Sequence, residues 1–134
     1  MKTVKIHIVT PDGPVVETEA DMVIAMTETG ELGILPGHIA TVAPLQIGGL
    51  RIKKGNDTKI IAVHGGFIEI RPEIITVLAQ SAETAETIDL ARAKHAAKRA
   101  EIALQAKKDE ASFLSAELQL KRAINRINAA ENRF

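Results

Sequence analysis

Apolar and polar residues alternate through much of the first 80 residues, the pattern of β-strands with one buried face. The segment TVKIHIV places Val4, Ile6 and Ile8 on one face. Further apolar runs cover residues 21–27, 65–70 and 74–80, residues 48–63 predict a hairpin turning at Lys54–Asp57, and turn clusters lie at 10–14 and 71–73. No helical stripe interrupts these runs, so they predict an antiparallel β-sandwich or barrel and not a βαβ fold.

The pattern changes after residue 87. From Ile88 to the last residue there is no glycine or proline, and alanine and other good helix formers dominate. The polar break KKDEAS (107–112) divides this part, and Asp109 is placed to cap a second helix. We therefore predict two helices of about 20 residues that form an antiparallel hairpin with its turn near residue 108.

The two predicted helices face each other mainly through alanines. The apolar stripe contains Ala93, Ala96, Ala97, Ala100 and Leu104 on the first helix, and Phe113, Ala116, Leu120, Ala123 and Ile127 on the second. Alanine buries little apolar area, so this seam is weak and the hairpin can open at small cost.

Charge separates the same two parts. Residues 1–87 carry seven basic and eleven acidic side chains, whereas residues 88–134 carry ten basic and six acidic ones, and the whole chain is neutral. The boundary falls between residues 83 and 88. The fold class is thus α+β, with a β-domain over residues 1–84 followed by a two-helix hairpin over residues 85–134.

Composition excludes several kinds of site. There is no cysteine for a disulfide, a zinc-thiolate site or a nucleophile. The four histidines lack metal-binding spacing, so we predict no metal site, and we expect His7, His64 and His95 to be structural. There is no tryptophan or tyrosine and there are only three phenylalanines, so base stacking on aromatic side chains is nearly unavailable.

The chain shows no export or membrane pattern. The first residues alternate and do not form an apolar run, as a signal peptide would. No window approaches 18 continuous apolar residues. We therefore expect a chain that works inside the cell.

Residues 29–38, TGELGILPGH, contain three glycines and one proline and predict a loop. The loop has no lysine of the kind found in phosphate-binding loops, and Glu31 and His38 have no nucleophile or orienting partner nearby in the sequence. We predict no catalytic residue here. A loop that carries Ile34 and Leu35 more often turns a corner or presents apolar side chains to a partner.

The segment ETIDLARAK (86–94) starts the first helix, with Thr87 as a cap and Asp89 in the first turn. Closing the hairpin brings Arg92 level with the region between Arg122 and Arg126. Arg99 lies two turns further along the same face of the helix. Guanidinium groups match phosphate oxygens, so the gathered arginines suit an anion.

Carboxylates lie beside these arginines in the sequence. Glu83 and Asp89 could accept hydrogen bonds from an amine or from ribose hydroxyls, and the combination suits a nucleotide. A simpler interpretation is that Asp89 only caps, that Arg99 forms a surface pair with Glu117 and that the other arginines are solvated. Spacing alone favours the simpler interpretation.

Several segments resemble a known family. VTPDGPV (9–15), GELGILPGH (30–38), AVHGGFIEI (62–70) and VLAQSAE (77–83), followed by the helical tail, are similar to the epsilon subunits of bacterial F-type ATP synthases. The resemblance covers nearly the whole chain. It implies a β-sandwich with a helical hairpin, in agreement with the pattern above, and a rotor-stalk subunit that is not itself an enzyme.

The resemblance also implies partners and a location. The β-domain would bind the gamma subunit and the membrane c-ring, at the cytoplasmic face of the bacterial membrane. The helices would extend along gamma and inhibit hydrolysis by the catalytic alpha/beta hexamer, whose acidic surfaces suit a basic tail. The loop facing the c-ring would contain Glu31, Gly33, Ile34, Leu35 and His38.

Some Bacillus-like members of this family bind ATP through the motif Ile/Leu-Asp-x-x-Arg-Ala. Here the motif is filled by Ile88, Asp89, Arg92 and Ala93. The family's further ATP positions correspond to Glu83, Arg99, Arg122 and Arg126. The resemblance thus implies ATP as a regulatory ligand that holds the hairpin closed, and it leaves open whether Mg²⁺ accompanies it.

Three alternatives remain. The chain could be the same stalk subunit with negligible nucleotide regulation, its tail governed by proton-motive force or constitutively inhibitory. A nucleic-acid-binding module is disfavoured by the neutral charge and the missing aromatics. An independent enzyme is disfavoured because no nucleophile–base or metal constellation is present.

Overall fold

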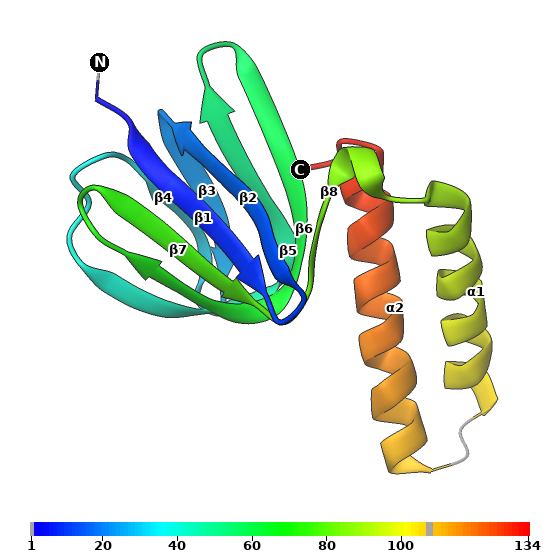
Figure 1. The fold of residues 1–134 in the computed structure, drawn as a ribbon. Coiled ribbons are helices and arrows are strands. Elements are labelled where there is room, and N and C mark those ends of the chain that lie inside the picture. The colour runs from blue at the N-terminus through cyan, green and yellow to red at the C-terminus, as the bar shows by residue number, and fades with distance from the viewer. Residues whose placement is uncertain (1, 107–108) are drawn as a thin grey trace.

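The computed structural model describes residues 2–106 and 109–134, and it has a β-domain followed by two helices (Figure 1). The strands are β1 (Val4–Thr10), β2 (Gly13–Ala20), β3 (Met22–Thr27), β4 (Gly30–Ile34), β5 (Thr41–Lys54), β6 (Asp57–Ile70), β7 (Ile74–Ala79) and β8 (Ala82–Thr84). A single 3₁₀ turn, η1 (Ala85–Thr87), leads to α1 (Leu90–Ala106) and α2 (Glu110–Ala130). The predicted α+β order of a β-sandwich and a helical hairpin is confirmed.

The strands follow the order β2-β1-β7-β6-β5-β3-β4, and β8 pairs with β6. The predicted alternation is confirmed on β1, where Val4, Ile6 and Ile8 are fully buried in the core. The predicted hairpin turn is also confirmed, since β5 ends at Lys54 and β6 begins at Asp57.

One pair departs from the antiparallel pattern, because β1 and β7 are parallel. These two strands are far apart in sequence, and a long connection between strands permits parallel pairing.

Three strands were not predicted: β2, β4 and the three-residue β8. β2 was missed because three consecutive polar residues, Glu17–Glu19, interrupt the alternation of apolar and polar side chains along it. Residues 29–38 were predicted as a loop, and this is wrong for residues 30–34, which form β4 and pair with β3 along its whole length. Gly30, with a φ of 125°, marks only the turn at the start of β4. Residues 35–38 form neither helix nor strand, so the loop prediction is confirmed for them.

The long strand β6 changes the face that it turns to the core. Its core residues are odd-numbered in the first half (Ile61 and Val63) and even-numbered in the second (Ile68 and Ile70). The change falls at Gly66, which has a φ of 117° and where a Cβ atom would overlap a carbonyl oxygen of β7. The other face of the first half of β6 is thereby left for the helices.

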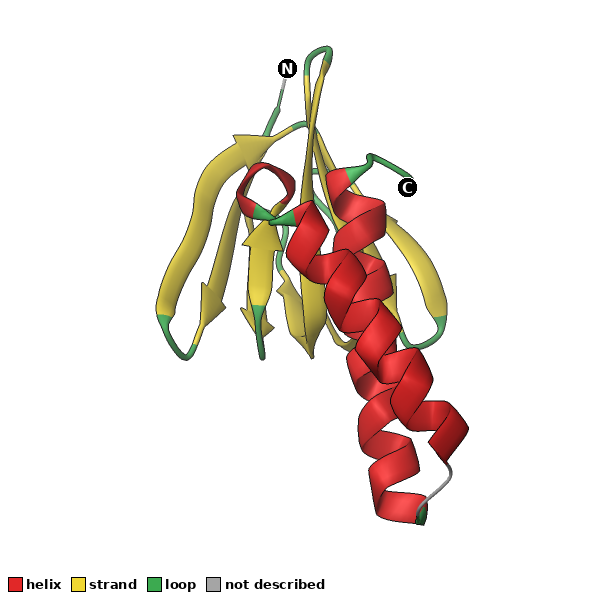
Figure 2. Cartoon of the chain, turned by 90° about the vertical axis from the view of Figure 1, so that its right-hand side faces the viewer, coloured by secondary structure: helices red, strands yellow, loops and turns green. Residues whose placement is uncertain are grey.

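The helix α2 lies between the β-domain and α1, as the two views in Figures 1 and 2 show. It packs on β6, where Ile60 and Ala62 form a small buried cluster with Ala129. Near its other end, the predicted N-cap of Asp109 is confirmed, since its Oδ1 accepts from the Ser112 amide at 2.7 Å. This hydrogen bond lowers the pKa of the Asp109 carboxyl below its usual value.

The start of α1 differs from the prediction. Thr87 lies in η1 and donates its hydroxyl to the Thr84 carbonyl at 2.9 Å, so it is not the cap. Asp89 takes that place, because its Oδ1 accepts from the Arg92 amide at 3.0 Å. A Thr-x-Asp sequence offers two candidate caps, and the extended backbone at Ile88 decides in favour of the second.

The seam between α1 and α2 is made of alanines, as predicted. Ala93, Ala97 and Ala100 are buried on α1, and Ala116 and Ala123 on α2. Phe113 was wrongly placed in this stripe, since its side chain is 39% exposed. The predicted turn at residue 108 lies outside the described residues.

Two further contacts attach α2 and the residues after it to the β-domain. The side-chain amide of Asn125 is buried and donates to the Gly48 carbonyl at 3.0 Å and to the Val63 carbonyl at 3.4 Å. The ring of Phe134 lies against Gly49, where a Cβ atom would overlap it. The hairpin is therefore held to the β-domain by few groups, and Asn125 is its central polar contact.

Replacing Asn125 with alanine should loosen the hairpin while the β-domain stays folded. The substitution removes two hydrogen bonds to carbonyls under the helix, at a cost of about 1–1.4 kcal/mol. We expect trypsin to cleave within α2 about five to ten times faster in N125A. The control is Gln119→Ala, an exposed position on the same helix. Equal cleavage rates in both variants would contradict the anchoring role.

Candidate functional site at the junction of the helices and the β-domain

A cavity of about 380 Å³ opens where α1, α2 and the end of the β-domain meet. It is lined by Glu83, Thr87, Ile88, Asp89, Arg92, Ala93, Ala96, Arg99 and Arg126. These residues come from β8, from η1 and the link after it, and from both helices. The cavity exists in this form only while the hairpin lies against the β-domain.

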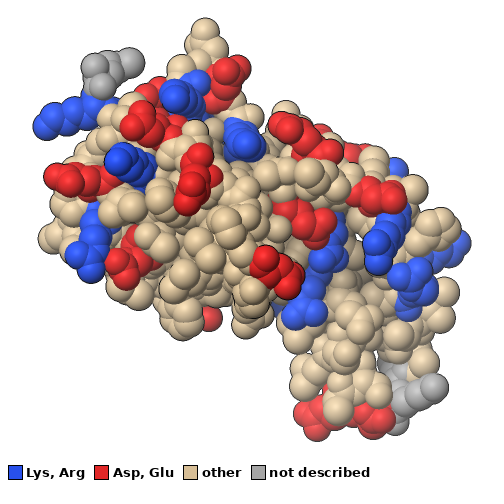
Figure 3. All heavy atoms as spheres, in the orientation of Figure 1, with Lys and Arg blue, Asp and Glu red and all other residues tan. Residues whose placement is uncertain are grey.

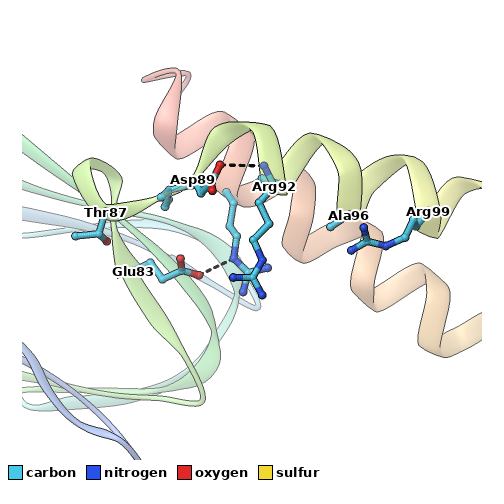
Figure 4. Close-up of a pocket in the computed structure, with 9 residues that line it drawn as sticks. Glu83, Thr87, Asp89, Arg92, Ala96 and Arg99 are labelled. Atoms are coloured by element: carbon cyan, nitrogen blue, oxygen red, sulfur yellow. Dashed lines mark hydrogen bonds and ion pairs between the residues drawn. The ribbon is translucent and has the colours of Figure 1, made fainter.

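An ion pair joins the β-domain to α2 at the cavity. The Nε atom of Arg126 donates to Oε1 of Glu83 at 2.5 Å (Figure 4). Both side chains are about one-third exposed, so water screens the pair. A ligand that excluded this water would strengthen every charged contact in the cavity.

The start of α1 supplies the opposite wall. Because Asp89 caps the helix, its carboxylate is fixed at the rim beside the first turn. Figure 4 shows Arg92 and Glu83 pointing into the same part of the cavity, and Arg99 reaching along α1 toward Ala96. The backbone of α1 thus sets the spacing of two guanidinium groups on one side of the cavity.

The charges in the cavity are unbalanced. Three guanidinium groups line it, those of Arg92, Arg99 and Arg126, against the two carboxylates of Glu83 and Asp89. Figure 3 shows the same mixture on one face, with basic side chains of the helices beside acidic ones near the junction. An anionic ligand with hydrogen-bond donors elsewhere would satisfy both kinds of group.

The structure brings together seven of the eight residues expected at a nucleotide site. The exception is Arg122, which is half-buried one turn before Arg126 and does not line the cavity. Thr87 and Ala96 line it as well and were not expected there. Arg99 does not form the surface pair considered with Glu117, because within the described part of the chain Glu117 pairs with Lys121, at 3.6 Å.

A buried histidine lies next to this site. His64 is 1% exposed, and its Nδ1 atom is 3.0 Å from the Ser81 hydroxyl. Burial, and the nearby Arg126, lower the pKa of His64 to about 4, so its ring is neutral at pH 7. From the sequence we expected only a structural histidine. His64 is nevertheless two residues from Ala62 and four from Ile60, so the three share one face of the strand, and that pattern could have placed His64 under the helix.

The segment expected to face a partner is only partly available. Ile34 is fully buried in the core, so its expected exposure to a partner is wrong. Its place in β4 explains this, because alternate side chains of that strand point inward. Leu35, in contrast, is 57% exposed.

The other residues of that segment have local contacts. Glu31 pairs with Arg51 on β5, and a Cβ atom on Gly33 would lie 2.9 Å from the Met22 side chain. The Nδ1 atom of His38 lies 2.7 Å from the Ile39 carbonyl. These contacts hold the segment in place and form no catalytic constellation.

No helix in the described residues is long and apolar enough to cross a membrane.

Two family models match the chain. The beta-sandwich domain of the ATP synthase delta/epsilon chain matches residues 3–85, and the long alpha-helix domain of the same chain matches residues 86–131. Together they cover nearly the whole sequence, and their border falls at η1.

Known proteins agree with these matches. The ATP synthase epsilon chain of Bacillus velezensis is 56% identical over 98% of this chain and 100% of its own length. That of Anoxybacillus flavithermus is 62% identical over 80% of each chain, and that of Bacillus subtilis is 55% identical over 97% of this chain and 98% of its own.

Solved structures show the same fold. A chain in the mitochondrial ATP synthase of Euglena gracilis aligns with a TM-score of 0.81 at 23% identity, over 92% of this chain and 78% of that one. A chain in the central stalk and c-ring of the Tetrahymena thermophila enzyme aligns with a TM-score of 0.60 at 13% identity, over 96% and 97%. From the full-length matches at more than half identity, the chain belongs to the ATP synthase epsilon chain family.

Proposed function

We propose that the chain is a non-catalytic subunit of the central stalk of a bacterial F-type ATP synthase, with a hairpin that ATP holds against the β-domain. The epsilon chains of Bacillus species support the first part. The structural neighbours belong to F1 and the c-ring of one mitochondrial ATP synthase and to the central stalk and c-ring of another. The partners are then gamma, the c-ring and the catalytic alpha/beta hexamer, with the chain peripheral to the cytoplasmic face of the membrane.

One observation carries the regulatory part of the proposal. The cavity takes its lining from three places that move apart when the hairpin leaves the β-domain and its two helices separate: Glu83 on β8, Arg92 and Arg99 on α1, and Arg126 on α2. A ligand in this cavity binds the docked hairpin and loses most of its contacts to the released one. Its binding free energy therefore shifts the population toward the docked state.

ATP is the ligand class that suits these side chains best. The guanidinium groups would hold phosphate oxygens, and the carboxylates would accept hydrogen bonds from the adenine amine or the ribose hydroxyls. Arg122 would join this set only by a rearrangement of α2, since it lies outside the cavity lining.

Release of the hairpin would expose it to the catalytic subunits. Apolar side chains already lie on its surface in the docked state, among them Ile102, Leu114 and Leu118. Contiguous exposed apolar patches are typical of interaction surfaces. At low ATP the freed helices would bind the hexamer and stop wasteful hydrolysis, and at high ATP they would stay docked.

A second candidate is the same stalk subunit without nucleotide control. Two observations favour it: Glu83 already pairs with Arg126, and Asn125 already holds α2 to the β-domain. Docking in that case would need no ligand. ATP titration of the purified chain separates the two candidates, since the second predicts no binding at cellular ATP concentrations.

Replacing Arg126 with alanine should lower the affinity for ATP by tenfold or more. The variant loses the charged hydrogen bond that the guanidinium would donate to a phosphate oxygen, worth about 1.5–3 kcal/mol. It also leaves the carboxylate of Glu83 without its partner, so that Glu83 repels the phosphates. Isothermal titration with ATP and ADP measures the effect. Lys98→Ala removes the same charge from an exposed position outside the cavity and should bind as the native chain does.

The same variant also tests inhibition. In the complex with gamma and the catalytic hexamer, R126A should inhibit hydrolysis at ATP concentrations at which the native chain does not. If R126A bound ATP with the native affinity, or if K98A lost as much affinity as R126A, Arg126 would not be part of the ATP site.

Replacing Asp89 with asparagine should weaken ATP binding about fivefold while α1 keeps its cap. Asparagine caps as well as aspartate does, but its amide is a weaker acceptor, by about 1 kcal/mol, than the carboxylate. Titration calorimetry, with circular dichroism to confirm helix content, checks both statements.

The matched control for capping is Asp109→Ala, which removes the equivalent cap of α2 at the far end of the hairpin. It should change ATP affinity less than twofold. If D109A weakened binding as much as D89N, Asp89 would be acting through helix stability and not through contact with ATP.

A further inference from the structure

His64 lies on the face of β6 that α2 covers. It continues the row of Ile60 and Ala62, which pack against Ala129 of α2. All three residues of the row are buried, and His64 is 1% exposed. The imidazole is thus buried by a helix that is held to the β-domain by few other groups.

Charged groups of two neighbouring elements face the ring. Arg122 and Arg126 approach from α2, and Glu83 approaches from β8. The strand β5 places the uncharged Ile47 opposite His64. From the α1 side, Arg92 lines the same cavity as Arg126. The surroundings are therefore more positive than negative.

The ring has a hydrogen-bond partner for one nitrogen only. Its Nδ1 atom contacts the Ser81 hydroxyl, whereas its Nε2 atom is buried and has no partner among the described residues. A neutral imidazole tolerates this at the cost of one unsatisfied atom. An imidazolium has two N–H donors, and the second would be charged and unpaired beside two guanidinium groups.

We propose that His64 makes docking of the hairpin sensitive to protons, so that the neutral ring permits docking and protonation of the ring favours release. The proposal rests on the mobility of the hairpin proposed above, but not on the identity of its ligand. It assigns a regulatory role to a side chain outside the nucleotide cavity.

The direction of the effect follows from the pKa of His64 in the two states. In the docked chain, desolvation and the cation of Arg126 lower this pKa to about 4. When α2 leaves, the ring meets water and both arginines depart, so the pKa returns to the ordinary value of about 6.5. The released state therefore binds more protons. Docking is fully favoured above pH 6.5 and weakens as the pH falls from there toward 4.

These values set the size of the effect. Between pH 7.5 and pH 5.5 the equilibrium constant for docking should fall roughly tenfold. Glu83 opposes the trend, since its carboxylate favours the imidazolium. If Glu83 turned to the protonated ring, however, it would give up its ion pair with Arg126, and that also loosens α2.

The test measures docking directly and without ATP. The chain has no cysteine, so two introduced ones can be labelled with a donor and an acceptor dye. Exposed positions that suit this purpose are Asp57 in the β-domain and Gln105 near the end of α1. Energy transfer is recorded from pH 7.5 to pH 5 for the labelled chain, for His64→Gln and for His7→Gln in the same background.

We expect the docked population of the labelled chain to fall as the pH is lowered, because the equilibrium constant for docking drops roughly tenfold by pH 5.5 and roughly 27-fold by pH 5. H64Q should remain docked across the range, because glutamine can still hydrogen-bond Ser81 but cannot take up a proton. H7Q removes a half-exposed histidine of β1 and should follow the native profile. Far-ultraviolet circular dichroism identifies any variant that has unfolded, and His64→Ser then replaces H64Q.

The outcomes separate this proposal from the proposed function. A pH profile that is the same with and without His64 overturns the role of the histidine, even if ATP binds and docks the hairpin at pH 7.5. A profile that flattens in H64Q supports it, even if ATP has no effect at any pH. An equilibrium constant for docking that does not change between pH 7.5 and pH 5 in the native background also overturns it.

Discussion

The attachment of α2 to the first half of β6 is the contact on which the rest of the structure depends. Ala129 packs there on Ile60 and Ala62. The attachment is extended by the amide of Asn125, which donates to the carbonyls of Gly48 on β5 and Val63 on β6, and by the pair of Arg126 with Glu83 on β8. The cavity between the helices and the β-domain exists because of this contact. The burial of His64 depends on it too.

A contact of this size suits a switch. The apolar area that alanines bury is small, and an ion pair that is one-third exposed contributes at most about 1 kcal/mol. A ligand or a proton that acts at the junction with a free energy of one to a few kcal/mol can therefore change the docked population substantially. The β-domain has no such sensitivity, because its core of large aliphatic side chains is continuous and fully buried.

Much of this arrangement could be predicted from the sequence, for identifiable reasons. The alternation on β1, the turn between β5 and β6 and the cap at Asp109 are local features, and each was correct. The errors arise where distant segments decide the outcome. β4 is a strand despite its glycines because β3 lies beside it, and Ile34 is buried for the same reason.

At the site, too, local features were predicted correctly and features that depend on distant segments were not. Helical spacing placed the arginines of α1 near those of α2, because both helices rise at the same pitch. It could not show that Arg126 turns to Glu83 while Arg122 stays outside the cavity, since side-chain direction depends on how α2 sits on the sheet. The roles of Asn125 and His64 were also missed, although the sequence already places His64 in the same alternating row as Ile60 and Ala62. They depend on the change of face at Gly66, which only the folded strand reveals.

Hydrogen exchange of the full chain with and without ATP tests the central claim most directly, that a ligand at the junction stabilises the docked hairpin. The account predicts that ATP slows exchange at the amides of α1 and α2 and leaves those of β1 unchanged, because the β-domain is folded in both states. Exchange that is unaffected by ATP at cellular concentrations, or slowed equally throughout the chain, would contradict it.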